Sequence, residues 1–291
     1  MKNNQPTTDL PVLLPAAETM AKHAVYERKT GTFSLRFKAR HGIYLALLTL
    51  ITTAAAQAQA APELDNIFTV LWRWKAFLLE GFGFNILISF MAMTIGTATG
   101  VLLGLMQVSL MPTVRASSWI VTQFFRNAPW LTLLFFTMFM LPFEFHIGSI
   151  RIPFPDWIKA VIGLSLPVMA NISEVVRGAI KSIPYGQWEA SEALAFSRHQ
   201  QLWQIILPQC IKRMIPPWMN WYAILTMATV LASIVGVDEI MARAGQVSAA
   251  EDGRTDLLLP LYSFILLLFF IYCYPIARWT IRLERKFAVK F

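Results

Sequence analysis

Long apolar runs constrain this chain more than any other feature of its sequence. There are six of them, over residues 42–61, 81–110, 118–141, 157–175, 215–237 and 257–277. A helix needs about 20 predominantly apolar residues to cross a bilayer, and these runs are of that order. Helices are the expected form, because irregular or open-sheet backbone could not satisfy its polar groups in lipid. The sequence therefore predicts an all-α membrane protein.

The composition supports this prediction and excludes several classes of function. Charged residues make up only 14% of the sequence and the mean hydropathy is +0.52, whereas a soluble domain carries about a quarter charged residues. The two cysteines, Cys210 and Cys273, lack the spacing of metal ligands or of a redox pair, so we interpret them as packing residues. The sequence has no glycine-rich phosphate loop and no nucleophile elbow. If ATP drives this protein, another chain must bind it.

The distribution of basic residues predicts the sides of the membrane. The N-terminal tail, residues 1–41, is basic and is followed by the first run, so it is expected in the cytoplasm. Six crossings then return the basic tail 278–291 to the cytoplasm, and they also place the basic loop 178–214 there. Three segments are expected outside: 62–80, 142–156 and 238–256. We therefore expect a multi-pass protein with a cytoplasmic C-terminus.

The first run, residues 42–61, has two interpretations. Its most apolar part, residues 43–53, is short, and it ends in Ala58-Gln59-Ala60, which looks like a signal-peptidase site. The basic region before it is, however, long for a signal peptide. We favour an uncleaved N-terminal transmembrane helix over a signal-peptide-like segment, and either one leaves five spans behind it.

A polar, amphipathic segment, Glu189–Pro208, lies between two apolar runs. Residues 187–194 favour helix, and a helical pattern resumes over residues 200–207 before the proline. Two helical pieces should therefore meet near Ala195. A glycine at this position could adopt a positive φ at little cost, whereas alanine pays more for the same conformation. We therefore interpret Ala195 as a sign of a softer bend.

The spacing of this segment resembles the cytoplasmic coupling loop of ATP-binding-cassette (ABC) importer permeases. That pattern is E-A-A, three residues, G, nine residues, I, one residue, L-P. The matching residues here are Glu189-Ala190-Ser191, Ala195, Ile205 and Leu207-Pro208. Ser191 replaces the second alanine of the pattern and Ala195 replaces its glycine. The resemblance implies that a separate ATPase docks on a defined set of residues: Glu189, Ala190, Ser191, Ala195, Phe196, Ser197 and Arg198.

The resemblance covers about residues 77–291. Phe124–Pro129 is similar to F-F-R-N-T-P of the polar amino acid branch, and Ser173–Ile180 is similar to its A-E-I-V-R-G-G-I. This branch comprises importers of the histidine, glutamine, arginine and opine type. The resemblance implies the type I importer fold, with a five-helix permease core over 77–277 in addition to the N-terminal transmembrane helix. It also implies a place in the bacterial inner membrane.

The resemblance implies several partners and no cofactor bound by this chain. Such importers have two permease chains, two ATPase subunits that bind ATP, and an extracytoplasmic binding protein. Many members have L-K-N-S-S-L where our alignment places residues 226–231, so Met227 and Ala228 stand in place of lysine and asparagine. We therefore favour a heterodimer with a second homologous permease that carries more of the substrate contacts. Membrane lipid and a small amino acid substrate are expected, and nucleic acid is not.

Three polar residues of the spans are candidates for the translocation path: Arg126, Glu174 and Thr229. A charge at membrane depth usually faces a partner or a water-filled path. Arg126 could instead snorkel or pair, and Glu174 lies three residues before Arg177, where the two can pair on one helix face. Pairing is the favoured interpretation for Glu174. Thr229 is the residue of the fifth run that stays close to the polar L-K-N-S-S-L pattern, where it stands in place of a serine.

The leading prediction is a transmembrane permease subunit of an ATP-driven importer for polar amino acids or related small zwitterions, without catalytic residues of its own. The alternative is an ion-coupled secondary transporter or a channel without an ATPase partner. That class calls for rows of intramembrane carboxylates or broken half-helices. On the outer side, Glu251 and Asp252 are expected to attract the binding protein.

Overall fold

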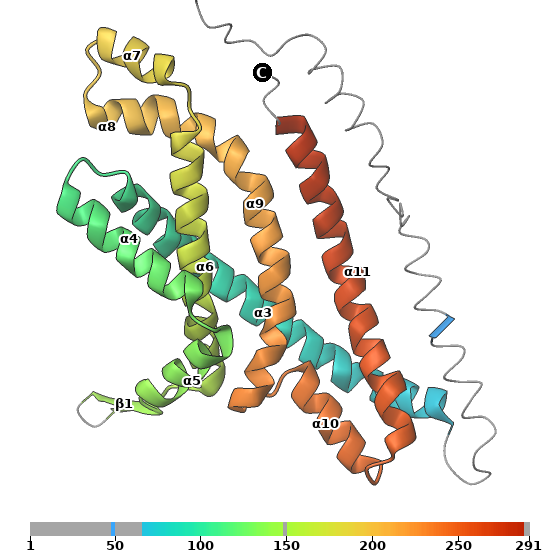
Figure 1. The fold of residues 1–291 in the computed structure, drawn as a ribbon. Helices are drawn as coiled ribbons and strands as arrows, with labels where there is room; N and C mark the ends of the chain where they lie inside the picture. The colour runs from blue at the N-terminus through green and yellow to red at the C-terminus, as the bar shows by residue number, and fades with distance from the viewer. Residues whose placement is uncertain (1–47, 50–65, 148–149, 288–291) are drawn as a thin grey trace, which may run out of the picture. The chain divides into compact units, whose positions relative to one another are not determined.

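The computed structural model describes residues 48–49, 66–147 and 150–287. The first apolar run, 42–61, therefore lies outside the described residues except for Leu48 and Thr49, and its interpretation stays a prediction. The described chain is almost entirely helical (Figure 1). Its elements are α3 (Ile67–Gln107), α4 (Pro112–Asn127), α5 (Trp130–Met140), β1 (Glu144–Ile147), β2 (Ile150–Pro153), α6 (Asp156–Lys181), α7 (Tyr185–Ala193), α8 (Arg198–Gln200), η1 (Gln201–Ile206), α9 (Leu207–Ala228), η2 (Thr229–Val235), α10 (Ile240–Ala250) and α11 (Thr255–Phe287).

Four helices among the described residues are long and apolar enough to cross a membrane. They are Ile67–Gln107, Asp156–Lys181, Arg198–Val235 and Thr255–Phe287. Large apolar side chains on α11 remain exposed within the chain, among them Leu266 at 69%. A lipid-facing helix has this property, because lipid tails accept apolar side chains that water would reject.

The run 118–141, expected as one helix, is divided into two. Ala128 has an extended backbone, with φ −74° and ψ 137°, and α5 begins after Pro129. Proline has no N–H to continue the helical bonding, and it disfavours the helical conformation of the residue before it. Both α4 and α5 pack against α6, so together they take the place expected for one span.

The contact between α3 and α6 depends on three glycines of α3 at four-residue spacing: Gly96, Gly100 and Gly104. A Cβ atom added at Gly100 would lie 2.7 Å from the Met169 carbonyl oxygen and 2.9 Å from Ile172 Cβ. Small residues at this spacing let two helix backbones approach closely. The spacing is visible in the sequence, although the sequence does not show which helix it meets.

The connecting elements gather at two opposite ends of the bundle (Figure 1). Helices α7 and α8 lie at one end, while α10 and the β1–β2 hairpin lie at the other. The hairpin is antiparallel and pairs His146 with Arg151. This grouping agrees with the predicted topology, in which 178–214 lies on one side of the membrane while 142–156 and 238–256 lie on the other.

Candidate functional site

The predicted elbow is present, but its bend is not the softer one that the sequence suggested. Ala195 has a φ of 59°, the left-handed conformation that glycine adopts easily. Its N–H donates to the Glu192 carbonyl at 2.8 Å. Ser197 then caps α8, because its hydroxyl accepts from the Gln200 N–H while the Gln200 side chain accepts from the Ser197 N–H. Alanine therefore makes the same sharp turn as glycine and carries the strain.

Replacing Ala195 with glycine is expected to stabilise the elbow by about 1 kcal/mol, because a non-glycine residue in this conformation costs about 1–2 kcal/mol. The matched control is Ala190→Gly, at an exposed position inside α7, where glycine costs up to about 1 kcal/mol. Thermal unfolding of the purified protein should show a higher midpoint for Ala195→Gly and a lower one for Ala190→Gly. Equal decreases would show that residue 195 does not hold a positive φ.

Most of the residues expected to meet an ATPase lie on the surface of this elbow. Five are exposed: Glu189, Ala190, Ala195, Ser197 and Arg198. Phe196 is half-buried. Ser191 is only 2% exposed and donates to the Trp188 carbonyl, so it supports α7 from within.

The elbow carries two charged side chains of interest: Arg198 contacts a neighbouring aromatic residue, and Glu189 has no such contact among the described residues. The Arg198 guanidinium lies over the Trp188 ring, 4.2 Å from its centroid, which orients α8 against α7. Glu189 forms no hydrogen bond or ion pair with any residue that the structure describes. An exposed carboxylate without such a partner is available to another chain.

The structure brings two of the three path candidates, Arg126 and Glu174, close together. Arg126 Nη1 lies 3.7 Å from Glu174 Oε2, and Arg177 Nε donates to Glu174 Oε1 at 3.1 Å. The pairing predicted for Glu174 with Arg177 is present, and Arg126 lies within ion-pair distance of the same carboxylate. The Glu174 side chain is 15% exposed, so it is shielded but still reachable from solvent.

A buried polar network that the sequence analysis missed lies beside this ion pair. Gln107 Nε2 donates to Thr122 Oγ1 at 2.9 Å and to Ser173 Oγ at 3.1 Å, and the two hydroxyls lie 3.0 Å apart. These contacts join α3, α4 and α6. The sequence did contain a signal for this network, namely single polar residues within apolar helices. Such residues are expected to have hydrogen-bond partners when they are buried.

Thr229, the third candidate, lies in a different network and is fully buried. It accepts a hydrogen bond from Asn85 Nδ2 at 2.9 Å, and the same nitrogen donates to Glu239 Oε2 at 2.7 Å. Glu239 also accepts from the N–H groups of Met241 and Ala242, which caps α10. Burial raises the pKa of the Glu239 carboxyl. This position gives Thr229 a structural contact between α3 and η2.

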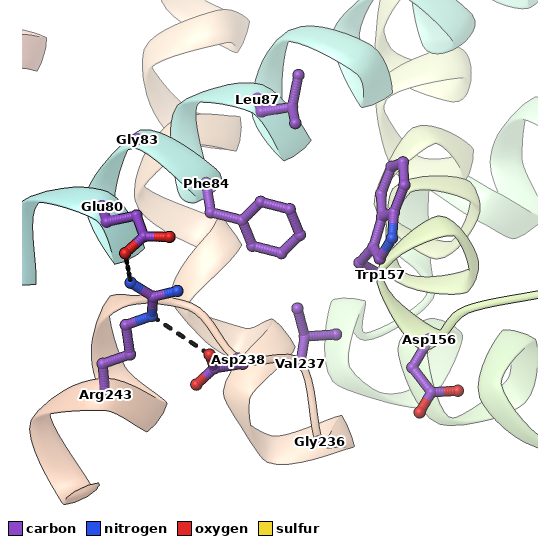
Figure 2. A pocket seen from close by; sticks show the side chains of 10 residues that line it. All are labelled: Glu80, Gly83, Phe84, Leu87, Asp156, Trp157, Gly236, Val237, Asp238 and Arg243. Atoms are coloured by element: carbon purple, nitrogen blue, oxygen red, sulfur yellow. Dashed lines mark hydrogen bonds and ion pairs between the residues drawn. The ribbon is translucent and has the colours of Figure 1, made fainter. Parts of the chain in front are cut away.

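A cavity of about 480 Å³ lies where α3, the start of α6 and the segment before α10 meet (Figure 2). Ten residues line it: Glu80, Gly83, Phe84, Leu87, Asp156, Trp157, Gly236, Val237, Asp238 and Arg243. Arg243 pairs with Glu80 at 2.9 Å and with Asp238 at 3.3 Å. The hydrogen bond that Arg243 donates to the Glu80 carboxylate raises the pKa of Arg243, so the guanidinium stays charged. No motif or spacing in the sequence brings these ten residues together.

Of the two acids expected to attract a binding protein, only Asp252 lies exposed. The Glu251 carboxylate accepts from Trp74 Nε1 at 2.8 Å and from Arg73 at 3.4 Å, and its side chain is 13% exposed. Its charge is therefore used to attach the end of α10 to α3. Of Glu251 and Asp252, only Asp252 therefore has an exposed charge that could attract a binding protein.

Residues 96–288 match the family described as the inner membrane component of binding-protein-dependent transport systems. The chain belongs to this family. It is 33% identical over 212 residues to the probable amino-acid ABC transporter permease protein YckA of Bacillus subtilis (strain 168), which covers 73% of this chain and 89% of that protein. It is also 33% identical over 188 residues to the inner membrane amino-acid ABC transporter permease protein YhdY of Escherichia coli (strain K12), which covers 65% of this chain and 50% of that protein.

Solved structures show the same fold. A crystal structure of an amino acid ABC transporter with histidines has a TM-score of 0.65 and 19% sequence identity, and the match covers 77% of this permease and 100% of that chain. The predicted type I importer fold is therefore confirmed. Among the described residues, α3, α6, the helix Arg198–Val235 and α11 are long and apolar enough to span the membrane, and the α4–α5 pair packs against α6.

Membership in the family confirms the predicted class of function. This permease is a membrane transport subunit, and ATP hydrolysis belongs to a separate subunit of the system. An ATPase and a binding protein are its partners. The alternative of an ion-coupled transporter or channel without an ATPase is excluded by the family.

Proposed function

We propose that this permease forms the translocation path of an importer for polar amino acids or related small zwitterions. The observation that carries the proposal is the exposed elbow around Glu189 and Ala195, which offers an unpaired carboxylate at the end of the bundle opposite the cavity. Complementary charges in the groove of an ATPase would pair with this carboxylate and orient the two proteins. Relatives named as amino acid permeases support the substrate class.

Uptake by the purified system tests the proposal. The permease, its ATPase and its binding protein are reconstituted in proteoliposomes, and the entry of labelled L-glutamine, L-arginine and L-histidine is measured with and without ATP. Accumulation should require ATP, the ATPase and the binding protein. Accumulation driven by an ion gradient without ATP would contradict the proposal.

The second permease chain is proposed to be a different protein. Met227 is 49% exposed on α9, at the position where the family pattern described under the sequence analysis has lysine. An apolar residue there leaves fewer substrate contacts on this chain, so a second permease would supply more of them. Native mass spectrometry of the intact complex should find one copy of this chain and one homologue, and two copies of this chain would contradict the heterodimer.

The C-terminus and the elbow are proposed to lie in the cytoplasm. An Ala249→Cys variant places a reactive thiol on an exposed position of α10. The native Cys210 and Cys273 are buried, so they give little background. We expect an impermeant maleimide to label residue 249 from outside intact cells, and labelling from the cytoplasmic side alone would reverse the orientation.

A further inference from the structure

The cavity between α3, α6 and α10 combines a charged side with an aromatic side (Figure 2). Arg243, Glu80 and Asp238 form the charged side. Phe84 and Trp157 form the aromatic side, with ring centroids 5.9 Å apart in an edge-to-face arrangement. Small-molecule sites commonly have this combination of apolar walls and a few placed polar groups.

Arg243 retains donors that its own partners do not use. Its Nη1 atom donates to the Phe77 carbonyl at 2.9 Å and pairs with Glu80, while Nε pairs with Asp238. No residue in the described part of the chain forms a hydrogen bond or ion pair with Nη2, which Figure 2 shows on the side of the guanidinium nearer Phe84. A carboxylate entering the cavity could therefore accept from Nη2 without breaking either ion pair.

The charges around the cavity have a negative balance. Three carboxylates line it, those of Glu80, Asp156 and Asp238, against the single guanidinium. One further cation lies nearby: Lys159 is buried, with Nζ 3.2 Å from Asp156 Oδ1 and 3.3 Å from the Phe143 ring centroid. Lys159 therefore compensates Asp156, and the carboxylates of Glu80 and Asp238 still share one guanidinium.

We propose that this cavity binds α-amino acids with neutral or cationic side chains and rejects dicarboxylic ones. The proposal rests on the proposed function and names the substrate class within it. The α-carboxylate would accept from Arg243 Nη2, and the α-ammonium would donate to Asp238 or Glu80, whose side chains are 54% and 73% exposed. The substrate side chain would lie along Phe84 and Trp157, where a second carboxylate would find no free cation.

The surrounding structure holds the start of α10, which carries Arg243, against α3. Asn85 Oδ1 accepts from the Ile240 N–H at 3.1 Å, and Asn85 Nδ2 donates to the buried Glu239. Gly81 lets α10 approach α3, since a Cβ there would lie 2.8 Å from Arg243 Cδ and 3.0 Å from the Ile240 backbone. A binding group whose position is fixed by such contacts loses little entropy on binding.

Direct binding tests the inference without the binding protein. The permease, in nanodiscs with its ATPase and partner permease, is equilibrated with radiolabelled L-glutamine, L-glutamate or L-arginine. Glutamine and glutamate have the same shape and differ by one charge. We expect glutamine and arginine to bind, and glutamate to bind at least about tenfold more weakly, because Coulomb terms of this kind reach a few kcal/mol near a protein surface.

Three variants make the test specific. Glu80→Gln combined with Asp238→Asn should reduce the preference for glutamine over glutamate by about tenfold. Arg243→Gln should remove the binding of all three amino acids that this chain contributes, leaving only binding by the partner permease. The matched control is Arg254→Gln, an arginine of similar exposure, 13% against 12%, that pairs with Asp256 and lies outside the cavity lining; it should leave binding unchanged.

Equal affinities for glutamine and glutamate in the wild type, or equal effects of the two arginine variants, would overturn the inference. The double carboxylate variant keeps the test valid if Arg243→Gln fails to fold, because it leaves the exposed side chains as amides that can still accept from Arg243. ATP-driven uptake by the wild type is measured in parallel. Uptake that persists while the variants leave binding unchanged removes only the cavity inference, whereas absent uptake removes the proposed function.

Discussion

A Gly100→Val substitution in α3 is expected to abolish the folded permease. The added Cβ would lie 2.7 Å from the Met169 carbonyl oxygen and 2.9 Å from Ile172 Cβ, closer than real Cβ contacts. The first contact is with backbone, so it cannot be relieved by a side-chain rotation. Overpacking typically costs about 1–3 kcal/mol, and here it separates α3 from α6, which approach closely along Gly96, Gly100 and Gly104.

The measurement is size-exclusion chromatography of the detergent-solubilised protein, followed by the thermal unfolding midpoint of any monodisperse fraction. We expect a loss of more than about tenfold in the monodisperse fraction, which corresponds to about 1.4 kcal/mol. The control is Gly178→Val in α6, an exposed glycine whose added Cβ would meet nothing within 4 Å. Similar behaviour of the two variants would show that the α3–α6 contact does not depend on glycine.

A Glu189→Lys substitution is expected to leave the permease folded and to abolish uptake. Glu189 is exposed on α7 and has no partner among the described residues, so reversing its charge should change the free energy of unfolding by less than about 0.5 kcal/mol. In a docked groove the same reversal replaces attraction with repulsion, which can cost several kcal/mol when the pair is desolvated.

Co-purification of the ATPase with tagged permease measures the docking, and ATP-driven uptake measures the coupling. Glu284→Lys is the matched control, because this exposed acid lies on α11, away from the elbow sequence. It should retain both the ATPase and uptake. Normal co-purification and normal uptake by Glu189→Lys would refute the role assigned to the elbow.

Several features were predictable because they depend on local sequence. Apolar runs long enough to cross a bilayer predict membrane helices wherever they occur, since lipid leaves the backbone no other bonding partner. The elbow was predictable from the alternation of helix-forming residues and breaks around Glu189–Pro208. The pairing of Glu174 with Arg177 followed from their spacing on one helix face.

Other features were misjudged because they depend on what a residue meets in space. Ala195 was expected to soften the bend, yet the surrounding contacts hold it at a φ of 59°. Glu251 was expected to be available to a partner, yet Trp74 and Arg73, far away in sequence, take up its carboxylate. Neither the strain at Ala195 nor the contacts of Glu251 can be predicted from the residues adjacent to them in the sequence.

The sequence by itself determined that this protein is a helical membrane permease with an elbow over Glu189–Pro208, because hydrophobic length and motif spacing are properties of short segments. Only the tertiary structure decided which helices the glycines at 96, 100 and 104 bring together. It alone placed Glu80, Trp157 and Arg243 around one cavity. The physical reason is that close packing and burial are set by groups distant in the chain, and their pairing is defined only once the helices have packed.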